Sequence, residues 1–137
     1  MNPSAHVVVV SLLSLAIAQA VKCAIVWSKK GKLTIDVFFE DGQMPSAHSA
    51  TLTALAVGVF LVDGFSLAFA VAFFLALFVI HDALHIRREV GRHAVFLNKM
   101  KGKHLFKETT GHSLNEVFMG MLLGFLVTGI YAYFFLI

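Results

Sequence analysis

Residues 67–80, LAFAVAFFLALFVI, form a run with no polar side chain. With its flanks, this run is long enough to cross about 30 Å of hydrocarbon as a helix. Three other segments have the same character, and the predicted membrane-spanning helices lie at about 5–27, 46–62, 65–86 and 113–136. The sequence therefore predicts an all-α integral membrane protein, with four transmembrane helices in a bundle.

The composition points the same way. The chain has 137 residues, of which 58% are hydrophobic, and its mean hydropathy is +0.83. Soluble domains contain roughly 45–50% apolar residues, so the composition favours an integral membrane protein over a soluble fold. The length allows one domain, and we expect residues 1–137 to form a single membrane domain.

The basic residues are confined to a few places in the sequence. All eleven Lys and Arg residues lie at the end of the first apolar segment, in the loop 28–45, or in segment 87–112. With four spans, these places share one side of the membrane. Positive residues accumulate on the cytoplasmic side, so we predict a plasma (inner) membrane protein whose basic loops face the cytoplasm and whose termini are extracytoplasmic.

Segment 87–104 has a helical pattern of its own on that face. Val90, Ala94, Leu97 and Met100 recur every three to four residues among basic side chains. This spacing predicts a cytoplasmic, interfacial amphipathic helix.

The last apolar segment contains small residues at a helical spacing. Gly120 and Gly124 are four residues apart, a pattern that lets helices approach closely in membranes. We expect a tight helix contact there, and a homo-oligomer.

Two histidines, His48 and His112, each open an apolar segment on the predicted cytoplasmic face. Imidazole is costly inside a bilayer and useful at its edge, where an anionic headgroup can reach it. Glu116 follows His112 by one helical turn, so its carboxylate could accept the imidazole N–H and fix the tautomer. The alternative is that Ser113 and Glu116 only form a capping box.

His48 stands in the string Pro45-Ser46-Ala47-His48. A helix start with free N–H groups, a hydroxyl and an imidazole can cradle an oxyanion. The alternative is a polar helix cap at the interface.

A third polar cluster follows the most apolar segment. Arg87 and Arg88 could bind phosphate oxygens through their guanidinium forks, or could serve only as topology anchors. Asp82 is an acid inside a span and needs a partner, which Lys22, Arg87 or a metal ion could supply.

Lys22 has Gln19 one turn earlier on its helix face. Such a lysine could extend to the headgroups or point inward at a phosphate.

A metal site built from Asp82, His85 and Glu116 is also conceivable, although the spacing matches no strong metal motif.

Taken together, these elements resemble the divergent branch of the type 2 phosphatidic acid phosphatase superfamily, which also includes vanadium-dependent haloperoxidases. The resemblance covers nearly the whole chain. It is carried by the following elements: Gln19-x-x-Lys22, Met-Pro-Ser-Ala-His-Ser-Ala-Thr at 44–51, Asp82 followed by Arg87-Arg88, and Gly-His-x-x-x-Glu-Val at 111–117.

The resemblance implies that His112 attacks phosphorus to form a phosphohistidine and that His48 protonates the leaving group. It makes Glu116 the acid that orients His112, and it implies no metal requirement. It gives phosphate binding to Lys22, Ser46 and the arginines. The superfamily usually places Ser-Arg six residues before the nucleophile, where this chain has Leu105 and Phe106, so Arg87 or Arg88 would have to reach the site instead.

The predicted function is hydrolysis of a lipid phosphomonoester or diphosphate at the cytoplasmic face, without a cofactor and without a nucleic-acid partner. A second hypothesis is a non-catalytic membrane protein that binds anionic lipid through its basic face. A third is a lipid headgroup enzyme that uses a divalent metal on Asp82, His85 and Glu116.

Overall fold

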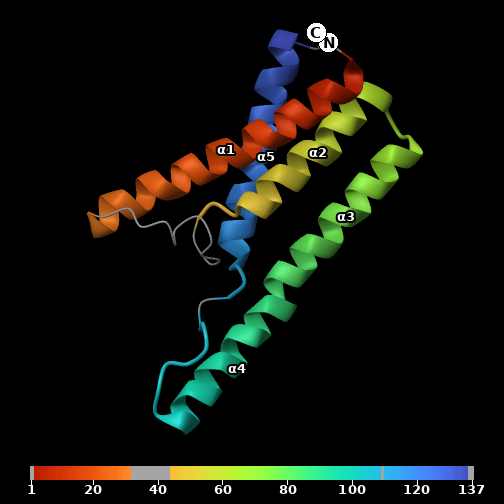
Figure 1. Cartoon of the computed structure of the whole chain (residues 1–137). Coiled ribbons are helices and arrows are strands. Elements are labelled where there is room, and N and C mark those ends of the chain that lie inside the picture. Colours follow the sequence, from red (N-terminus) through yellow and green to blue (C-terminus); the bar gives the residue numbers. More distant parts are fainter. Residues whose placement is uncertain (1, 32–43, 109, 136–137) are drawn as a thin grey trace.

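The structure is a computed structural model that describes residues 2–31, 44–108 and 110–135, and within these ranges it is helical, with no strand. This confirms the predicted all-α membrane fold, and the helix ends lie within a few residues of the predicted ones (Figure 1). The helices are α1 (Pro3–Lys30), α2 (Ala47–Asp63), α3 (Leu67–Leu84), α4 (Ile86–Lys101) and α5 (Leu114–Phe135).

The apolar helices differ in length. Three helical stretches are long and apolar enough to cross a membrane, and α2 is a shorter apolar helix beside them. One of the three stretches, Leu67–Lys101, joins α3 to α4, because the helix is interrupted only at His85. In Figure 1 α4 continues the line of α3 away from the other helices.

The helix ends have local causes. Ser46 and Ser66 cap the starts of α2 and α3, where their side chains accept from Ser49 N and Phe69 N. Gly64 and Gly102 have φ of 62° and 61° and follow α2 and α4. Such positive φ values end a helix readily at glycine.

Close packing of α5 on α2 forms the centre of the bundle. A Cβ atom on Gly120 would collide with the carbonyl oxygen of Ser46, and one on Gly124 would lie 2.5 Å from the carbonyl oxygen of Ala50. Only hydrogen fits at these two positions, so the predicted small-residue contact is confirmed as a contact within the chain.

The segment after α4 folds back along that helix. The Asn98 side chain, which is 4% exposed, donates to the carbonyl of Phe106 and to Glu108 Oε1. It also accepts from the amides of Leu105 and Phe106. We call residues 103–108 the return segment, because they lead the chain back from the tip of α4.

Most of the predicted apolar stripe of α4 is exposed, where a membrane interface could contact it, and only Ala94 belongs to the buried face. The buried face of α4 consists of Gly91, Ala94 and Asn98, whereas Leu97 and Met100 are exposed. The sequence analysis did not predict that the return segment covers this side of the helix. The location of α4 at a membrane interface stays a prediction.

Candidate functional site

The His112 imidazole is buried and paired with Glu116. Its Nδ1 lies 3.1 Å from Glu116 Oε2, and the histidine is 5% exposed. The same carboxylate oxygen accepts from the amide of Ser113 at 2.9 Å, and Ser113 Oγ accepts from the amide of Glu116. The two roles considered for Glu116, imidazole partner and capping box, therefore coexist in one geometry.

This pairing determines which ring nitrogen is available for chemistry. An ionised carboxylate only accepts hydrogen bonds, so Nδ1 carries the proton when it bonds to Glu116. The lone pair of a neutral His112 is then on Nε2.

The loop before α5 is fixed on the end of α3. Gly111 has φ of +83°, and a Cβ there would lie 2.6 Å from the amide nitrogen of Arg88. The amide of His112 donates to the carbonyl of Ala83 at 3.0 Å. Both the positive φ and the lack of space require glycine at this turn.

His48 lies near His112 at the start of α2. Their ring centroids are 6.5 Å apart, and His48 is exposed. The amide of Ser46 donates to the carbonyl of Glu116 at 3.0 Å. The starts of α2 and α5 are therefore joined through main-chain atoms, which holds the two imidazoles on one side of the bundle.

Ser46, two residues before His48, has a side-chain partner that the sequence analysis did not identify. Ser46 is fully buried and Ser49 is 1% exposed. Ser49 Oγ donates to Ser46 Oγ at 3.0 Å. The Ser46 hydroxyl also accepts from the Ser49 amide and so caps α2. An anion at His48 would meet this helix N-terminus.

Lys22 lies at the same level of the bundle. Ala18 packs against Ala47 and Ala50, so Lys22, one turn further along α1, lies beside the start of α2. Lys22 is only 5% exposed. Gln19 Oε1 is buried and has no hydrogen-bond partner within the described ranges.

The acid and arginines at the end of α3 are more exposed. Arg87 Nε lies 2.8 Å from Asp82 Oδ2, with about a third or more of each side chain exposed. Arg87 is thus one of the partners predicted for Asp82. Arg88 is exposed, and its backbone supports Gly111. Contact of either arginine with phosphate stays a prediction.

The residues considered for a metal site do not come together. Glu116 pairs with His112, Asp82 pairs with Arg87, and the His85 ring stacks on His81 with centroids 4.4 Å apart. Among the side chains of the described residues, no group of three His, Cys, Asp or Glu could hold a metal ion. The set Asp82, His85 and Glu116 therefore does not fit a shared ion.

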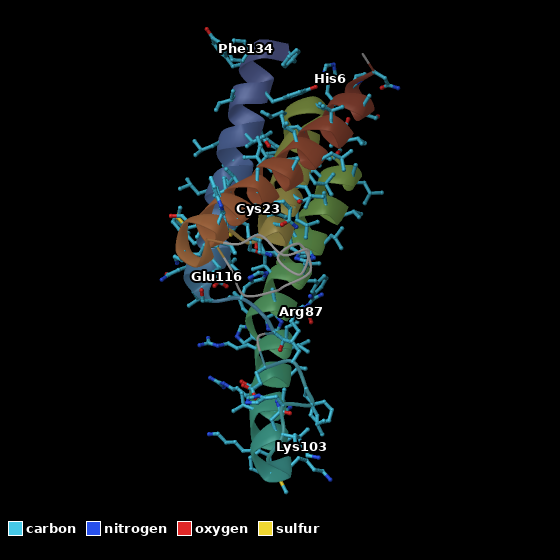
Figure 2. The ribbon with its side chains drawn as sticks, turned by 60° about the vertical axis from the view of Figure 1, so that its left-hand side comes forward. His6, Cys23, Arg87, Lys103, Glu116 and Phe134 are labelled. Atoms are coloured by element: carbon cyan, nitrogen blue, oxygen red, sulfur yellow. The ribbon has the colours of Figure 1, made fainter. Side chains whose placement is uncertain are left out.

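Figure 2 shows where these parts lie along the molecule. Glu116 and Arg87 are near its middle, His6 and Phe134 are at one end, and Lys103 is at the tip of α4. At the end opposite to the tip, His6 Nδ1 forms a hydrogen bond of 2.9 Å with Tyr131 Oη. The histidine pair thus lies between the helical bundle and the α4 arm.

The apolar helices define a helical integral membrane protein. His48 and His112, at the starts of two of these helices, give it a polar site at one end of the bundle. A sequence profile described as the Divergent PAP2 family matches residues 4–127, and the chain belongs to this family. The matched region contains every candidate site residue.

A relative in Bacillus subtilis (strain 168), named as the uncharacterized membrane protein YuiD, is 36% identical over 148 aligned positions. The alignment covers 92% of this chain and 93% of YuiD. No solved structure matches the chain. The family resemblance inferred from the motifs is therefore confirmed.

Proposed function

We propose that this protein is a lipid phosphate phosphatase in which His112 is the nucleophile. The observation that carries the proposal is the buried His112 imidazole, held through Nδ1 by Glu116 and lying 6.5 Å from the ring of His48. A nucleophile oriented by a carboxylate and facing a second acid–base group is the arrangement that covalent catalysis needs. Membership of the divergent PAP2 family supports it.

In the proposed reaction, Nε2 of neutral His112 attacks phosphorus while the bond from phosphorus to the lipid oxygen breaks. Protonated His48 donates its proton to that oxygen, which leaves as the lipid alcohol, or as a lipid monophosphate if the substrate is a diphosphate. In the second step water attacks the phosphohistidine, and His48 takes the proton of that water. Inorganic phosphate leaves and His112 returns to its neutral form.

The charge of the phosphoryl group is balanced by this chain's own groups. Lys22 and the N-terminus of α2, capped by Ser46, would bind its oxygens. Arg87 or Arg88 would complete the binding from the end of α3. We propose that no metal is required, since the acidic side chains nearest the histidines are already paired.

The distribution of charge supports a cytoplasmic orientation for the site. Arg92, Lys99, Lys101 and Lys103 lie on the same arm, beyond the histidines. Cytoplasmic segments carry such an excess of positive charge. We therefore propose that the lipid phosphate is hydrolysed at the cytoplasmic leaflet, with both termini on the opposite side.

The experiment is phosphate release from a panel of lipid phosphates by purified protein in detergent with EDTA. Wild type should release phosphate, and His112→Ala should be slower by at least about a thousandfold, since removing a nucleophile leaves little chemistry. The matched control is His93→Ala, a change at an exposed histidine of α4, which should behave as wild type. Equal rates for His112→Ala and wild type would refute the nucleophile.

A second candidate function is lipid binding without catalysis, favoured by the exposed basic and apolar side chains of α4. Binding of this kind depends on total charge and weakens with salt. This function is tested if neither the wild type nor any variant releases phosphate, with EDTA or with added divalent metal. Binding to anionic vesicles that depends on Arg92 and Lys99 would then establish it, provided that changes at His48 and His112 leave the binding unchanged.

A further inference from the structure

An apolar groove of about 500 Å³ runs between α2, α3 and α5. Its exposed lining is apolar and includes Leu77 on α3 and Phe125 on α5. The groove is separate from the histidine pair, and the mechanism proposed above makes no use of it.

One end of the groove begins next to the candidate site on all three helices. On α2 the lining residue Thr53 is one turn beyond Ser49, and on α5 Met121 follows Gly120, which packs on Ser46. On α3, Ile80 lies three residues before Ala83, whose carbonyl accepts from the His112 amide. At a rise of about 1.5 Å per residue, the groove starts roughly one helical turn from the site.

An aromatic cluster lines the other end. Phe60, Phe65 and Phe69 all line the groove. The Phe60 ring lies 5.0 Å from that of Phe65 and 5.4 Å from that of Phe69, and the Phe65 and Phe69 rings are 5.5 Å apart. The cluster sits where α2 turns into α3. In Figure 1 this turn lies at the far end of α2 from the helix start that carries His48.

We propose that the groove receives the hydrocarbon chain of the lipid phosphate and that the Phe60–Phe65–Phe69 cluster sets the longest chain accepted. This inference rests on the proposed function, because it assigns the phosphate to the histidines at the near end. A groove of this kind would make the protein selective for lipid phosphates of limited chain length.

The volume of the groove also limits the number of chains. Taking a methylene group as about the size of a water molecule, about 30 Å³, the groove holds on the order of fifteen of them. That is one chain. The favoured substrate class is therefore a single-chain lipid phosphate, such as a lysophospholipid, alkyl or prenyl phosphate.

Selection would come from shape. A chain in the bilayer is already in an apolar environment, so moving it into the groove gains little from the hydrophobic effect. A chain that is too long must instead bend or displace the aromatic rings, which lowers its rate.

The first test is a series of saturated phosphates from octyl to eicosyl, assayed in mixed micelles with wild type and with Phe65→Ala. Wild type should show a cutoff, with turnover dropping about tenfold over a few methylene groups. Phe65→Ala should move the cutoff to longer chains, a gain that a folding defect cannot produce. The matched control is Phe74→Ala, also an exposed phenylalanine but on α3 outside the groove, which should leave the cutoff in place.

The second test fills the groove. Leu77→Trp should lower the ratio of hexadecyl to octyl phosphate turnover about tenfold. Leu75→Trp is a close control, because Leu75 and Leu77 are both 46% exposed on α3 and only Leu77 lines the groove. A ratio that changes equally in both variants would overturn the proposal.

The remaining outcomes separate the groove from the chemistry. Equal hydrolysis of every chain length, unchanged in Phe65→Ala, would overturn the groove and leave the phosphatase. A Leu77→Trp variant that changes oligomeric state and keeps the wild-type length profile would make the groove an interface between copies and would also overturn the proposal.

If wild type hydrolyses none of the phosphates, the proposed function fails. Whether the groove binds an alkyl chain is then tested separately, by photocrosslinking. A diazirine-bearing hexadecyl phosphate should then crosslink to Met121 or Phe125. Crosslinking would support the groove, and crosslinking elsewhere, or none, would overturn it.

Discussion

The two sides of α2 are packed in different ways. Toward α5 the backbones approach so closely that only hydrogen fits at Gly120 and Gly124. Toward α3 the packing is more open, and an apolar groove remains between α2, α3 and α5. The close side fixes the distance between His48 and His112, whereas the open side leaves room for a ligand.

The largest expected effect on stability comes from disrupting the close contact between α2 and α5. Gly124→Leu places a side chain where a Cβ would already lie 2.5 Å from the Ala50 carbonyl oxygen. Overpacking of this kind should lower the free energy of unfolding in detergent by about 3 kcal/mol or more.

Gly129→Leu is the matched control, because a Cβ at Gly129 meets nothing within 4 Å. The gain in helix propensity is the same at both positions, so the difference in denaturant midpoints reports the contact with α2. Equal midpoints would contradict the close packing.

An intermediate effect is expected where the return segment is held on α4. Asn98→Ala removes the hydrogen bonds to Leu105, Phe106 and Glu108. Opening of the return segment should become easier by about 2 kcal/mol, since each bond contributes about 0.5–1.5 kcal/mol. Hydrogen exchange at the amides of Leu105 and Phe106 should speed up accordingly.

Asn115→Ala provides the control for that experiment, since Asn115 is an exposed asparagine on α5. It should leave exchange in the return segment unchanged. Unchanged exchange in Asn98→Ala as well would show that the return segment is held by other contacts.

The smallest effect on stability is expected at the ion pair between Asp82 and Arg87. The pair is partly exposed, so Asp82→Asn should change the free energy of unfolding by less than about 1 kcal/mol. Phosphate release separates the two partners: Arg87→Ala should reduce it about tenfold if the guanidinium binds phosphate, and Asp82→Asn should not. Equal rates in both variants would remove Arg87 from the site.

Much of this fold follows from local patterns in the sequence. Hydropathy is enough to predict the apolar helices, since a bilayer permits few alternatives to a helix. The glycine spacing at 120 and 124 predicted a close contact, and the turn around Gly64 and the stop at Gly102 depend only on nearby residues.

The relation between α3 and α4 could not be predicted in this way. The polar residues around His85 predicted the end of a span, and α3 ends at Leu84. They did not predict that α4 continues in line with α3 (Figure 1). The role of Asn98 was also missed, because its partners lie beyond the helix that contains it. Its position in the series Gly91, Ala94 and Asn98, spaced by three to four residues, was the available signal.

For the candidate site, the sequence provided the residue types but not their distances. It predicted that His48 and His112 lie on the same face of the membrane, and that the Glu116 carboxylate orients the His112 imidazole. It could not predict the main-chain bond from Ser46 to Glu116, since this depends on how α2 and α5 cross. For the same reason it offered a metal set of Asp82, His85 and Glu116, residues that the packing directs to separate partners.

The bond between the Ser46 amide and the Glu116 carbonyl has an evolutionary consequence. Its atoms belong to the backbone, so replacing either side chain does not remove it, unless position 46 becomes proline. Divergence can then exchange the reactive side chains while the spacing of the two helix starts is inherited. Within such a lineage the fold is a poor guide to activity, and the identities of the two residues at positions 48 and 112 are the better one.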